Sequence, residues 1–213
     1  SVANFQNGFS SISVPSVLAT LVSDELHFPN LSMVGVDDRA AAHTAVAHLI
    51  AQGHSKIAVL GGPATSFPSR MRRLGAQDAM EQAGLIFDDR LYGLSNYDFE
   101  SAYHAMNSLL ARRAEFTALF AMSDVIAFGA IRALVSAGFR VPQDVSVIGF
   151  DGITMSRYCV PVMTTIVQPS EQIALQSIEL LINQIEHGAP AQTITLQPEL
   201  QQGESVCPCR HPL

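Results

Sequence analysis

The sequence is poor in positive charge. Of its 213 residues only 12 are Lys or Arg, Lys56 is the only lysine, and the formal net charge is −7. The arginines are scattered, apart from a cluster formed by Arg70, Arg72 and Arg73. DNA binding needs a dense array of cations that displaces counterions from the phosphates. The composition therefore excludes a DNA-binding surface in these residues.

Long apolar runs and paired cysteines are also lacking. No apolar run reaches the roughly 20 residues that cross a bilayer, and no charged-then-apolar leader precedes a cleavage site. The three cysteines, Cys159, Cys207 and Cys209, are odd in number and form no CxxC pair of the zinc-binding type. We therefore expect no disulfide framework, no metal or cofactor, no membrane association, and a location in the reducing cytoplasm.

Motifs of known catalytic chemistry are absent as well. There is no GxSxG elbow and no HExxH motif, and residues 61–66 lack the spacing and the lysine of a P-loop. His43 and His48 are five residues apart on a predicted helix, so they do not share the face that a metal would need. We find no nucleophile–base pair. The sequence predicts that the protein is not an enzyme.

Strand and helix patterns alternate along the chain. The predicted strands comprise residues 17–20, 33–36, 56–60, 91–94, 117–121, 145–150, 164–167 and 194–196. The predicted helices comprise residues 39–51, 69–82, 99–112, 124–136 and 171–186. This alternation is typical of α/β proteins, in which a parallel sheet is covered by helices on both faces.

Polar side chains follow several of the predicted strands. In a parallel sheet these positions meet at one edge, where small ligands bind. The candidate ligand-binding residues are Thr20, Ser66, Arg72, Tyr97, Ser123 and Asp151. Arginine and aspartate can each make bidentate hydrogen bonds to vicinal hydroxyls, and an aromatic face covers apolar C–H surface. The set predicts a site for a sugar or a nucleoside.

Each candidate also has a purely structural interpretation. Asp151 would equally cap a turn at residues 153–157, and Ser123 would cap the helix that follows it. Arg72 would pair with a nearby acid such as Asp78. Tyr97 would simply pack on the loop. Sequence alone leaves these alternatives open.

Several segments together resemble the lactose/galactose-repressor (LacI/GalR) family of bacterial transcription regulators. The similarity is most informative at residues 141–152 (VPQDVSVIGFDG) and 161–169 (PVMTTIVQP). Further similar runs lie at residues 36–42, 48–58, 61–63, 72–75, 120–124, 129–134 and 138–142. Each run is weak by itself, but their order and spacing over residues 15–205 make the resemblance specific.

The resemblance implies an α/β fold of two lobes, like the type I periplasmic binding proteins, with helices on both faces of parallel sheets. Residues 37–167 would form the C-terminal, effector-binding lobe. Residues 1–36 and 168–213 would form a remnant of the N-terminal lobe and a tail. Family members begin with a DNA-binding headpiece and further strands. We therefore expect a part of a longer gene product with an incomplete N-terminal lobe.

The resemblance also implies roles for individual residues. In this family an arginine at the position of Arg72 and an aspartate at that of Asp151 clamp the effector, and an aromatic residue at that of Tyr97 covers it. The positions of Ser123 and Thr20 often hold asparagine and aspartate, so this chain departs from the family there. Replacing either clamping residue with alanine should abolish ligand-induced stabilisation and leave the fold intact.

Function and assembly follow from the same resemblance. We expect the effector-binding and dimerisation domain of a transcription regulator that senses a sugar or a nucleoside in the cleft between lobes. The alternative is a sugar-binding protein of a transport system. Homodimers would form through an apolar face for which Phe128, Tyr158 and Val160 are candidates, unless these side chains belong to the core. DNA would be contacted only through a headpiece outside these residues.

Overall fold

The computed structural model describes residues 13–210, which fall into two compact units. The first unit comprises the described residues up to Asp37 together with Gln168–Pro198. The second comprises Asp38–Val167 together with the described residues from Glu199 onward. The sequence predicts that residues 168–213 all belong with the first unit. In the structure, the described residues from Glu199 onward belong to the second unit instead.

The second unit is built on a sheet with the strand order β4-β3-β5-β6-β7-β9. The strands are β3 (Ile57–Gly61), β4 (Tyr92–Leu94), β5 (Ala118–Ala121), β6 (Ser146–Asp151), β7 (Thr164–Val167) and β9 (Glu199–Gln201). β9 pairs antiparallel with β7, and the other pairs are parallel. The chain adds β4 on one side of β3 and then returns to its other side with β5. Open α/β sheets bind ligands at the carboxyl ends of strands where the order reverses in this way.

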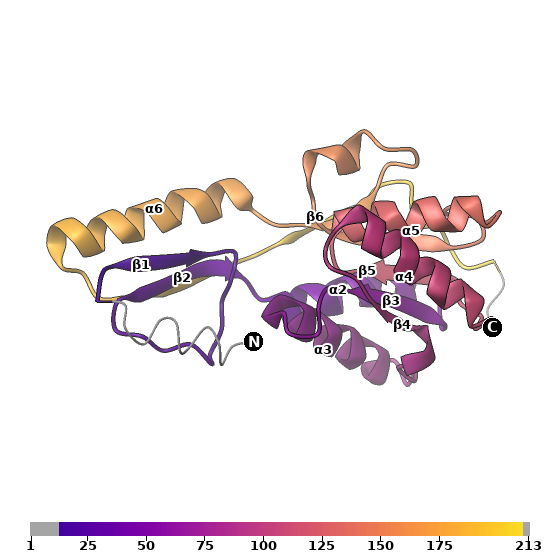
Figure 1. Ribbon diagram of the computed structural model, residues 1–213, viewed down its shortest axis with the longest axis horizontal. Coiled ribbons are helices and arrows are strands. Elements are labelled where there is room, and N and C mark those ends of the chain that lie inside the picture. Colours follow the sequence, from indigo (N-terminus) through magenta and orange to yellow (C-terminus); the bar gives the residue numbers. More distant parts are fainter. Residues whose placement is uncertain (1–12, 211–213) are drawn as a thin grey trace. The chain divides into compact units, whose positions relative to one another are not determined.

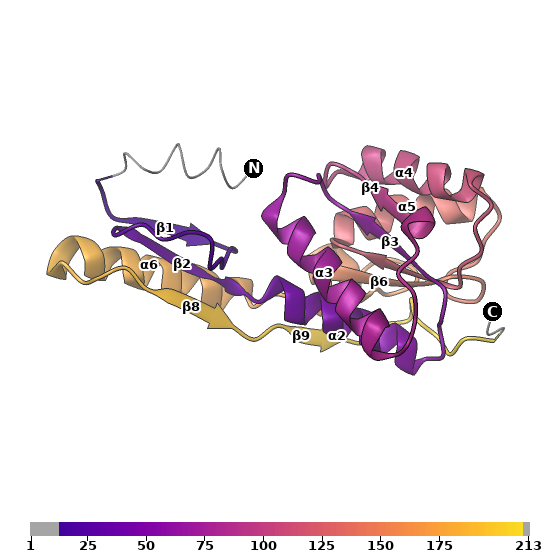
Figure 2. The same ribbon diagram turned by 90° about the horizontal axis from the view of Figure 1, so that it is seen from below.

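Helices cover both faces of this sheet (Figures 1 and 2). On one face α2 (Asp38–Ala51) packs against α3 (Phe67–Gln82), and on the other α4 (Phe99–Ala111) packs against α5 (Asp124–Ser136). Every residue of β3 and β5 is buried, because both faces of these strands are covered. Their side chains form one apolar core with the inner faces of the helices.

Gly75 allows α2 and α3 to approach each other closely. A Cβ atom at this position would lie 2.0 Å from the carbonyl oxygen of Arg39 and 3.0 Å from the backbone nitrogen of His43. Only a residue without a side chain fits against backbone at that distance. The close approach matters for the site, because α2 begins with Asp38 and α3 carries Arg72.

The first unit contains a parallel sheet with the order β1-β2-β8. Its strands are β1 (Ser16–Ala19), β2 (Leu31–Val36) and β8 (Thr193–Leu196). Helix α6 (Ser170–His187) packs on β1 and β2, and its Ile173 and Leu180 form a small core with Val34. Four other large apolar side chains of α6, Leu175, Ile178, Ile182 and Ile185, are exposed, and Leu181 is half-buried.

The structure confirms the predicted alternation of strands and helices. The bounds of α5 and β7 are as predicted, and those of most other elements differ by one or two residues. The predicted strand at residues 91–94 is divided between the 3-10 helix η1 (Asp89–Leu91) and β4. Strand β9 was not predicted, because three residues are too few for a periodic pattern. In residues 13–210 no helix combines the length and the apolar character that crossing a membrane requires.

Candidate functional site

The carboxyl ends of β3, β5 and β6 bring three predicted site residues to one edge of the second unit. Arg72 lies in the second turn of α3, Ser123 precedes α5, and Asp151 is the last residue of β6. Because these strands are parallel, the N-termini of α3, α4 and α5 lie at the same edge. Helix N-termini carry unpaired N–H groups and a partial positive charge, which favour the oxygen atoms of a ligand.

Arg72 is at the centre of this edge. Its side chain is only 6% exposed, and its Nε donates to Oδ1 of Asp38 at 2.7 Å. Its Nη1 donates to the carbonyl oxygen of Met122, which follows β5. The guanidinium carbon lies 3.6 Å from the centre of the Phe150 ring. A buried cation needs several such partners, because a single ion pair does not offset the free-energy cost of removing the charge from water.

Asp151 also forms an ion pair with the guanidinium of Arg72. Its Oδ1 is 3.6 Å from Nη1 of Arg72, and its side chain is 28% exposed. That distance indicates an ion pair rather than a direct hydrogen bond. The Asp151 backbone has a φ of +110°, which is rare for a residue with a side chain. The edge therefore presents a cationic donor and an accessible carboxylate acceptor beside each other.

Ser66 and Ser123 are both helix N-caps. Oγ of Ser66 accepts the backbone N–H of Ser69 at 3.4 Å, and Oγ of Ser123 accepts that of Ile126 at 3.1 Å. The capping interpretation of Ser123 is thus confirmed. A capping hydroxyl keeps its own hydrogen as a donor. Ligand contacts by the two serines stay predictions.

Tyr97 packs on the loop that follows β3. A Cβ atom on Gly62 would lie 2.0 Å from Cε2 of Tyr97, so the ring rests directly on the glycine backbone. This contact confirms the packing interpretation. Within residues 13–210 the Tyr97 hydroxyl is buried without a hydrogen-bond partner. Because such groups are rare in folded proteins, a ligand or water that reached this hydroxyl would stabilise it. A ligand contact stays a prediction.

Thr20 belongs to the first unit, where it follows β1. It is exposed and has a φ of +67°, and its backbone N–H donates to the carbonyl oxygen of Val34 at 2.7 Å. Its assignment to the ligand site stays a prediction.

The proposed pairing of Arg72 with Asp78 is wrong. Residues six positions apart lie on different faces of a helix, so the two side chains of α3 point away from each other. Asp78 instead accepts hydrogen bonds from the exposed Arg39 on α2. The acid that pairs with Arg72 in the protein interior is Asp38.

Asp124, the first residue of α5, lies at the same edge. It is fully buried, its Oδ2 accepts the backbone N–H of Ile153 at 2.9 Å, and its Oδ1 accepts the hydroxyl of Thr165 at 2.6 Å. Burial raises its pKa from 3.8 to about 6, although these hydrogen bonds act in the opposite direction. No local pattern signals a contact between residues this far apart in the chain.

The predicted N-cap role of Asp151 is also wrong. The turn after β6 forms the 3-10 helix η2 (Thr154–Arg157), whose N-cap is Ile153 and whose start has no side-chain cap bond. The Asp124 carboxylate holds this segment instead. The Asp151 side chain remains directed to Arg72.

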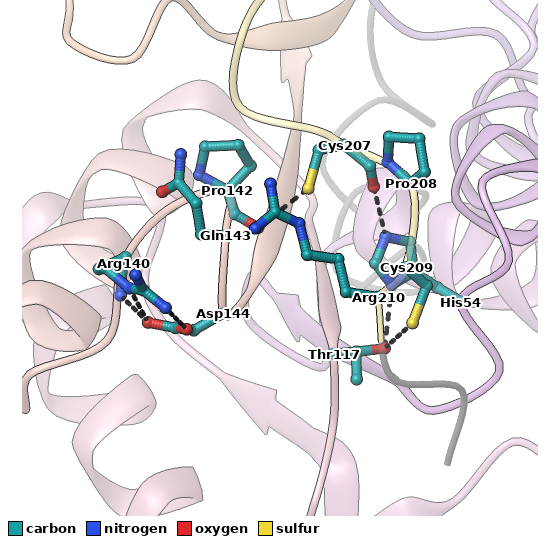
Figure 3. Close-up of a pocket in the computed structure, with 10 residues that line it drawn as sticks. All are labelled: His54, Thr117, Arg140, Pro142, Gln143, Asp144, Cys207, Pro208, Cys209 and Arg210. Carbon is teal, nitrogen blue, oxygen red and sulfur yellow. Dashed lines mark hydrogen bonds and ion pairs between the residues drawn. The ribbon is translucent and has the colours of Figure 1, made fainter.

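A separate cavity of about 220 Å³ lies at the opposite edge of the sheet, beside residues that precede β3, β5 and β6 (Figure 3). The His54 ring bonds the Thr117 hydroxyl at 2.9 Å and the Cys207 carbonyl at 3.0 Å. The thiol of Cys207 contacts the Pro142 carbonyl, and that of Cys209 contacts Thr117. None of the predicted ligand-binding residues lines this cavity. No group of three or more potential metal ligands occurs in the part of the chain that the structure describes.

Comparison with known proteins places the chain in a family. It matches the periplasmic binding protein-like domain over residues 46–206. It is 34% identical over 201 residues to the transcriptional regulator MalR of Clostridium butyricum, an alignment that covers 94% of this chain and 60% of MalR. The chain therefore spans less than two thirds of that relative's length.

Solved structures give the same result. A sugar-binding transcriptional regulator of the LacI family from Escherichia coli, complexed with phosphate, is 30% identical with a TM-score of 0.81, covering 98% of this chain and 74% of that one. A LacI-family regulator from Enterococcus faecium with bound ribose is 26% identical with a TM-score of 0.83, covering 99% of this chain and 77% of that one.

The fold is thus the α/β fold of periplasmic-binding-protein-like domains. The chain belongs to the LacI family of transcription regulators, of which it represents the effector-binding domain. These relatives are regulators, in agreement with the expectation that the chain is not an enzyme.

We predict that Arg72→Ala lowers the free energy of unfolding by about 3–5 kcal/mol, because it leaves the buried Asp38 carboxylate without its cation. This burial corrects the expectation that the change spares the fold. Urea unfolding followed by circular dichroism measures the loss. The control is Arg39→Ala, which removes an exposed pair worth about 0–1 kcal/mol. Equal losses in the two variants would contradict the central role of Arg72.

A second prediction concerns pH. The pKa of Asp124 is about 6 in the folded protein and 3.8 without its environment, so between these values the folded state binds more protons than the unfolded state. This contribution to stability is fully present below pH 3.8 and is lost as the pH rises through 6. The loss amounts to about 3 kcal/mol, at about 1.4 kcal/mol for each pKa unit. Asp124→Asn should flatten this part of the curve of unfolding free energy against pH.

The control for the pH prediction is Asp144→Asn. Hydrogen bonds from Arg140 lower the pKa of the exposed Asp144 from 3.8 to about 2. The ionised Asp144 carboxylate therefore contributes stability that is lost only as the pH falls below 3.8, the opposite direction from Asp124. An unchanged slope between pH 4 and 6 in Asp124→Asn would show that Asp124 is not the titrating group.

Proposed function

We propose that the second unit binds a small polyhydroxylated ligand, a sugar, at the edge formed by Arg72 and Asp151. The observation that carries this proposal is the pair itself: a guanidinium held in place by buried partners, beside a carboxylate that remains accessible. The two groups are 3.6 Å apart and the Asp151 side chain is 28% exposed, so a ligand bound to Asp151 would lie next to Arg72. The reversal of strand order between β3 and β5 supports a binding edge at this position.

A sugar suits this pair because each of its hydroxyls both donates and accepts. One hydroxyl can donate to Asp151 while its neighbour accepts from Arg72, and hydrogen bonds to charged groups contribute about 1.5–3 kcal/mol each. The buried partners of Arg72 fix the guanidinium before the ligand arrives. Binding therefore orders few additional side chains, which favours affinity.

The relatives support the same ligand class. The Enterococcus faecium structure holds ribose, and the Escherichia coli relative is described as sugar-binding. A nucleoside shares the vicinal hydroxyls of ribose and is the competing ligand of the same chemistry. We propose Ser66, Tyr97 and Ser123 as further contacts, in agreement with their positions after strands β3, β4 and β5.

We further propose that the whole protein is a cytoplasmic transcription regulator. Its ligand would bind one conformational state better than another, and this difference would be transmitted to a DNA-binding part. The formal charge of −7 and the single lysine of this chain favour DNA contact through another part of the protein.

The ligand proposal is tested by thermal unfolding with separate additions of ribose, hexoses, disaccharides, sugar phosphates and nucleosides. We expect one of these classes to raise the unfolding midpoint, with about 2.7 kcal/mol of stabilisation at a hundredfold excess over the dissociation constant. Asp151→Asn should abolish this shift with little effect on the fold, because asparagine tolerates a positive φ.

The matched control is Asp144→Asn, which removes a carboxylate at the opposite edge of the sheet. It should keep the ligand-induced shift. A shift that survives Asp151→Asn, or no shift with any of these compounds, would contradict the proposed site.

We also propose that the chain forms homodimers through the apolar segment that includes and follows η2. Tyr158 and Val160 are 76% and 93% exposed, so they are not core residues, and Met155 is exposed beside them. Phe128 packs against the core and is only partly buried, which favours its structural interpretation over an interface role. Clustered apolar side chains in contact with water are typical of interaction surfaces.

Sedimentation equilibrium tests this assembly. We expect a dimer at micromolar concentration and a shift to monomers in a variant that combines Tyr158→Ser and Val160→Ser. Ile86→Ser changes an exposed apolar residue elsewhere on the same unit and should leave the dimer intact. A monomeric unmodified chain, or a dimer that persists in the double variant, would contradict this interface.

A further inference from the structure

The backbone at Asp151 adopts an unfavourable conformation. Asp151 and Gly152 have consecutive positive φ angles of +110° and +70°. The glycine is required, because a Cβ atom there would lie 2.7 Å from Cγ2 of Val167. A residue with a side chain stays in such a conformation only when its surroundings impose it. Contacts with neighbouring residues must therefore hold the turn that carries the proposed ligand-binding carboxylate of Asp151.

Asp124 is placed to hold it. One oxygen, Oδ2, accepts the backbone N–H of Ile153 at 2.9 Å, and the N–H of Gly152 also stabilises the ionised carboxylate. The other oxygen, Oδ1, accepts the hydroxyl of Thr165 on β7 at 2.6 Å. The carboxylate thus joins the start of α5, the turn after β6, and β7.

The surrounding sequence makes room for this carboxylate. A Cβ atom on Gly149 would lie 2.2 Å from Oδ1 of Asp124, so a side chain in the middle of β6 would displace it. No ion pair is formed by Asp124 within residues 13–210, and its side chain is fully buried. Burying a carboxylate without a cation lowers the stability of the folded state, and an apolar residue of similar size would fill the space without this loss. The cost indicates that the hydrogen bonds serve the geometry of the turn.

The groups that face Asp124 do not neutralise it. The charge of Asp151 on β6 raises the pKa of Asp124 in addition to the larger effect of burial. Burial, and to a lesser extent the charge of Asp124, raises the pKa of the Cys159 thiol after η2. The carboxylate is therefore stabilised by the hydroxyl of Thr165 and the N–H groups of the turn.

We propose that Asp124 is a positioning residue: it clamps the turn at residues 151–153 in the conformation that directs the Asp151 carboxylate to Arg72. This inference rests on the proposed function for its biological meaning, because Asp151 is the ligand-binding acid of that proposal. The clamp itself is a property of the unliganded protein and can be measured without any ligand.

Three variants separate the clamp from general stability. Asp124→Asn keeps the size of the side chain but replaces one of its two acceptor oxygens with a donor. Thr165→Val removes the hydroxyl donor on β7, and Thr165→Ser restores it. Asp144→Asn is the control, because that carboxylate also accepts a backbone N–H, from Arg140, at the opposite edge of the sheet.

The first readout is amide hydrogen exchange of Ile153, measured by nuclear magnetic resonance without ligand. We expect exchange at least about tenfold faster in Asp124→Asn and Thr165→Val, and unchanged in Thr165→Ser and Asp144→Asn. The Ile153 amide proton shift of the unmodified protein should also titrate with the carboxyl group of Asp124, near pH 6. If Asp124→Asn fails to fold, the two Thr165 variants still decide the question. An Ile153 amide that is equally protected in Thr165→Val and Thr165→Ser would overturn the clamp.

The second readout is affinity for the sugar that raises the unfolding midpoint, measured by calorimetry. We expect about a tenfold weaker affinity in Thr165→Val and an unmodified affinity in Thr165→Ser. Equal affinities of these two variants would overturn the positioning role. If the unmodified chain binds none of the tested compounds, the proposed function fails, while the exchange of the Ile153 amide still decides the clamp.

Discussion

The buried guanidinium of Arg72 is the interaction on which the rest of the site depends. Its carboxylate partner Asp38 comes from α2, its carbonyl partner from the residue after β5, and its aromatic partner, Phe150, from β6. One side chain therefore connects three segments that are distant in sequence. The glycine contact between α2 and α3 is what allows the two helices to approach closely enough for this arrangement. We propose that the same side chain, which organises this edge, also binds a ligand beside Asp151.

The fold could be predicted from the sequence to a large extent. The apolar runs of β3 and β6 and the regular spacing of helices between strands indicate a parallel sheet, because burial on both faces leaves this pattern in the residues. The short strand β9 could not be predicted, since it is only three residues long and is defined by its pairing with β7. The unit to which the tail belongs depends on that pairing, and the prediction was wrong at this point.

The site was predicted in part, for a physical reason that differs from residue to residue. Arg72 and Asp151 follow strands whose carboxyl ends meet, so topology alone brings them together. Asp38 and Asp124 act through contacts with residues 34 and 29 positions away, which no local pattern encodes. The serines were ambiguous because a hydroxyl that caps a helix keeps a donor for another partner. The capping role and the proposed ligand contact are therefore compatible in both serines.

We propose that a sugar binds beside Arg72, and the side-chain Nε–H signals of the arginines report directly on that binding. The protein would be labelled with ¹⁵N-arginine and titrated with ribose and then with hexoses. We expect a saturable shift of the Arg72 signal and no shift of the signals of Arg140 and Arg210, which line the cavity at the opposite edge. Shifts confined to Arg140 and Arg210, with Arg72 unaffected, would place the ligand elsewhere and contradict the proposed site.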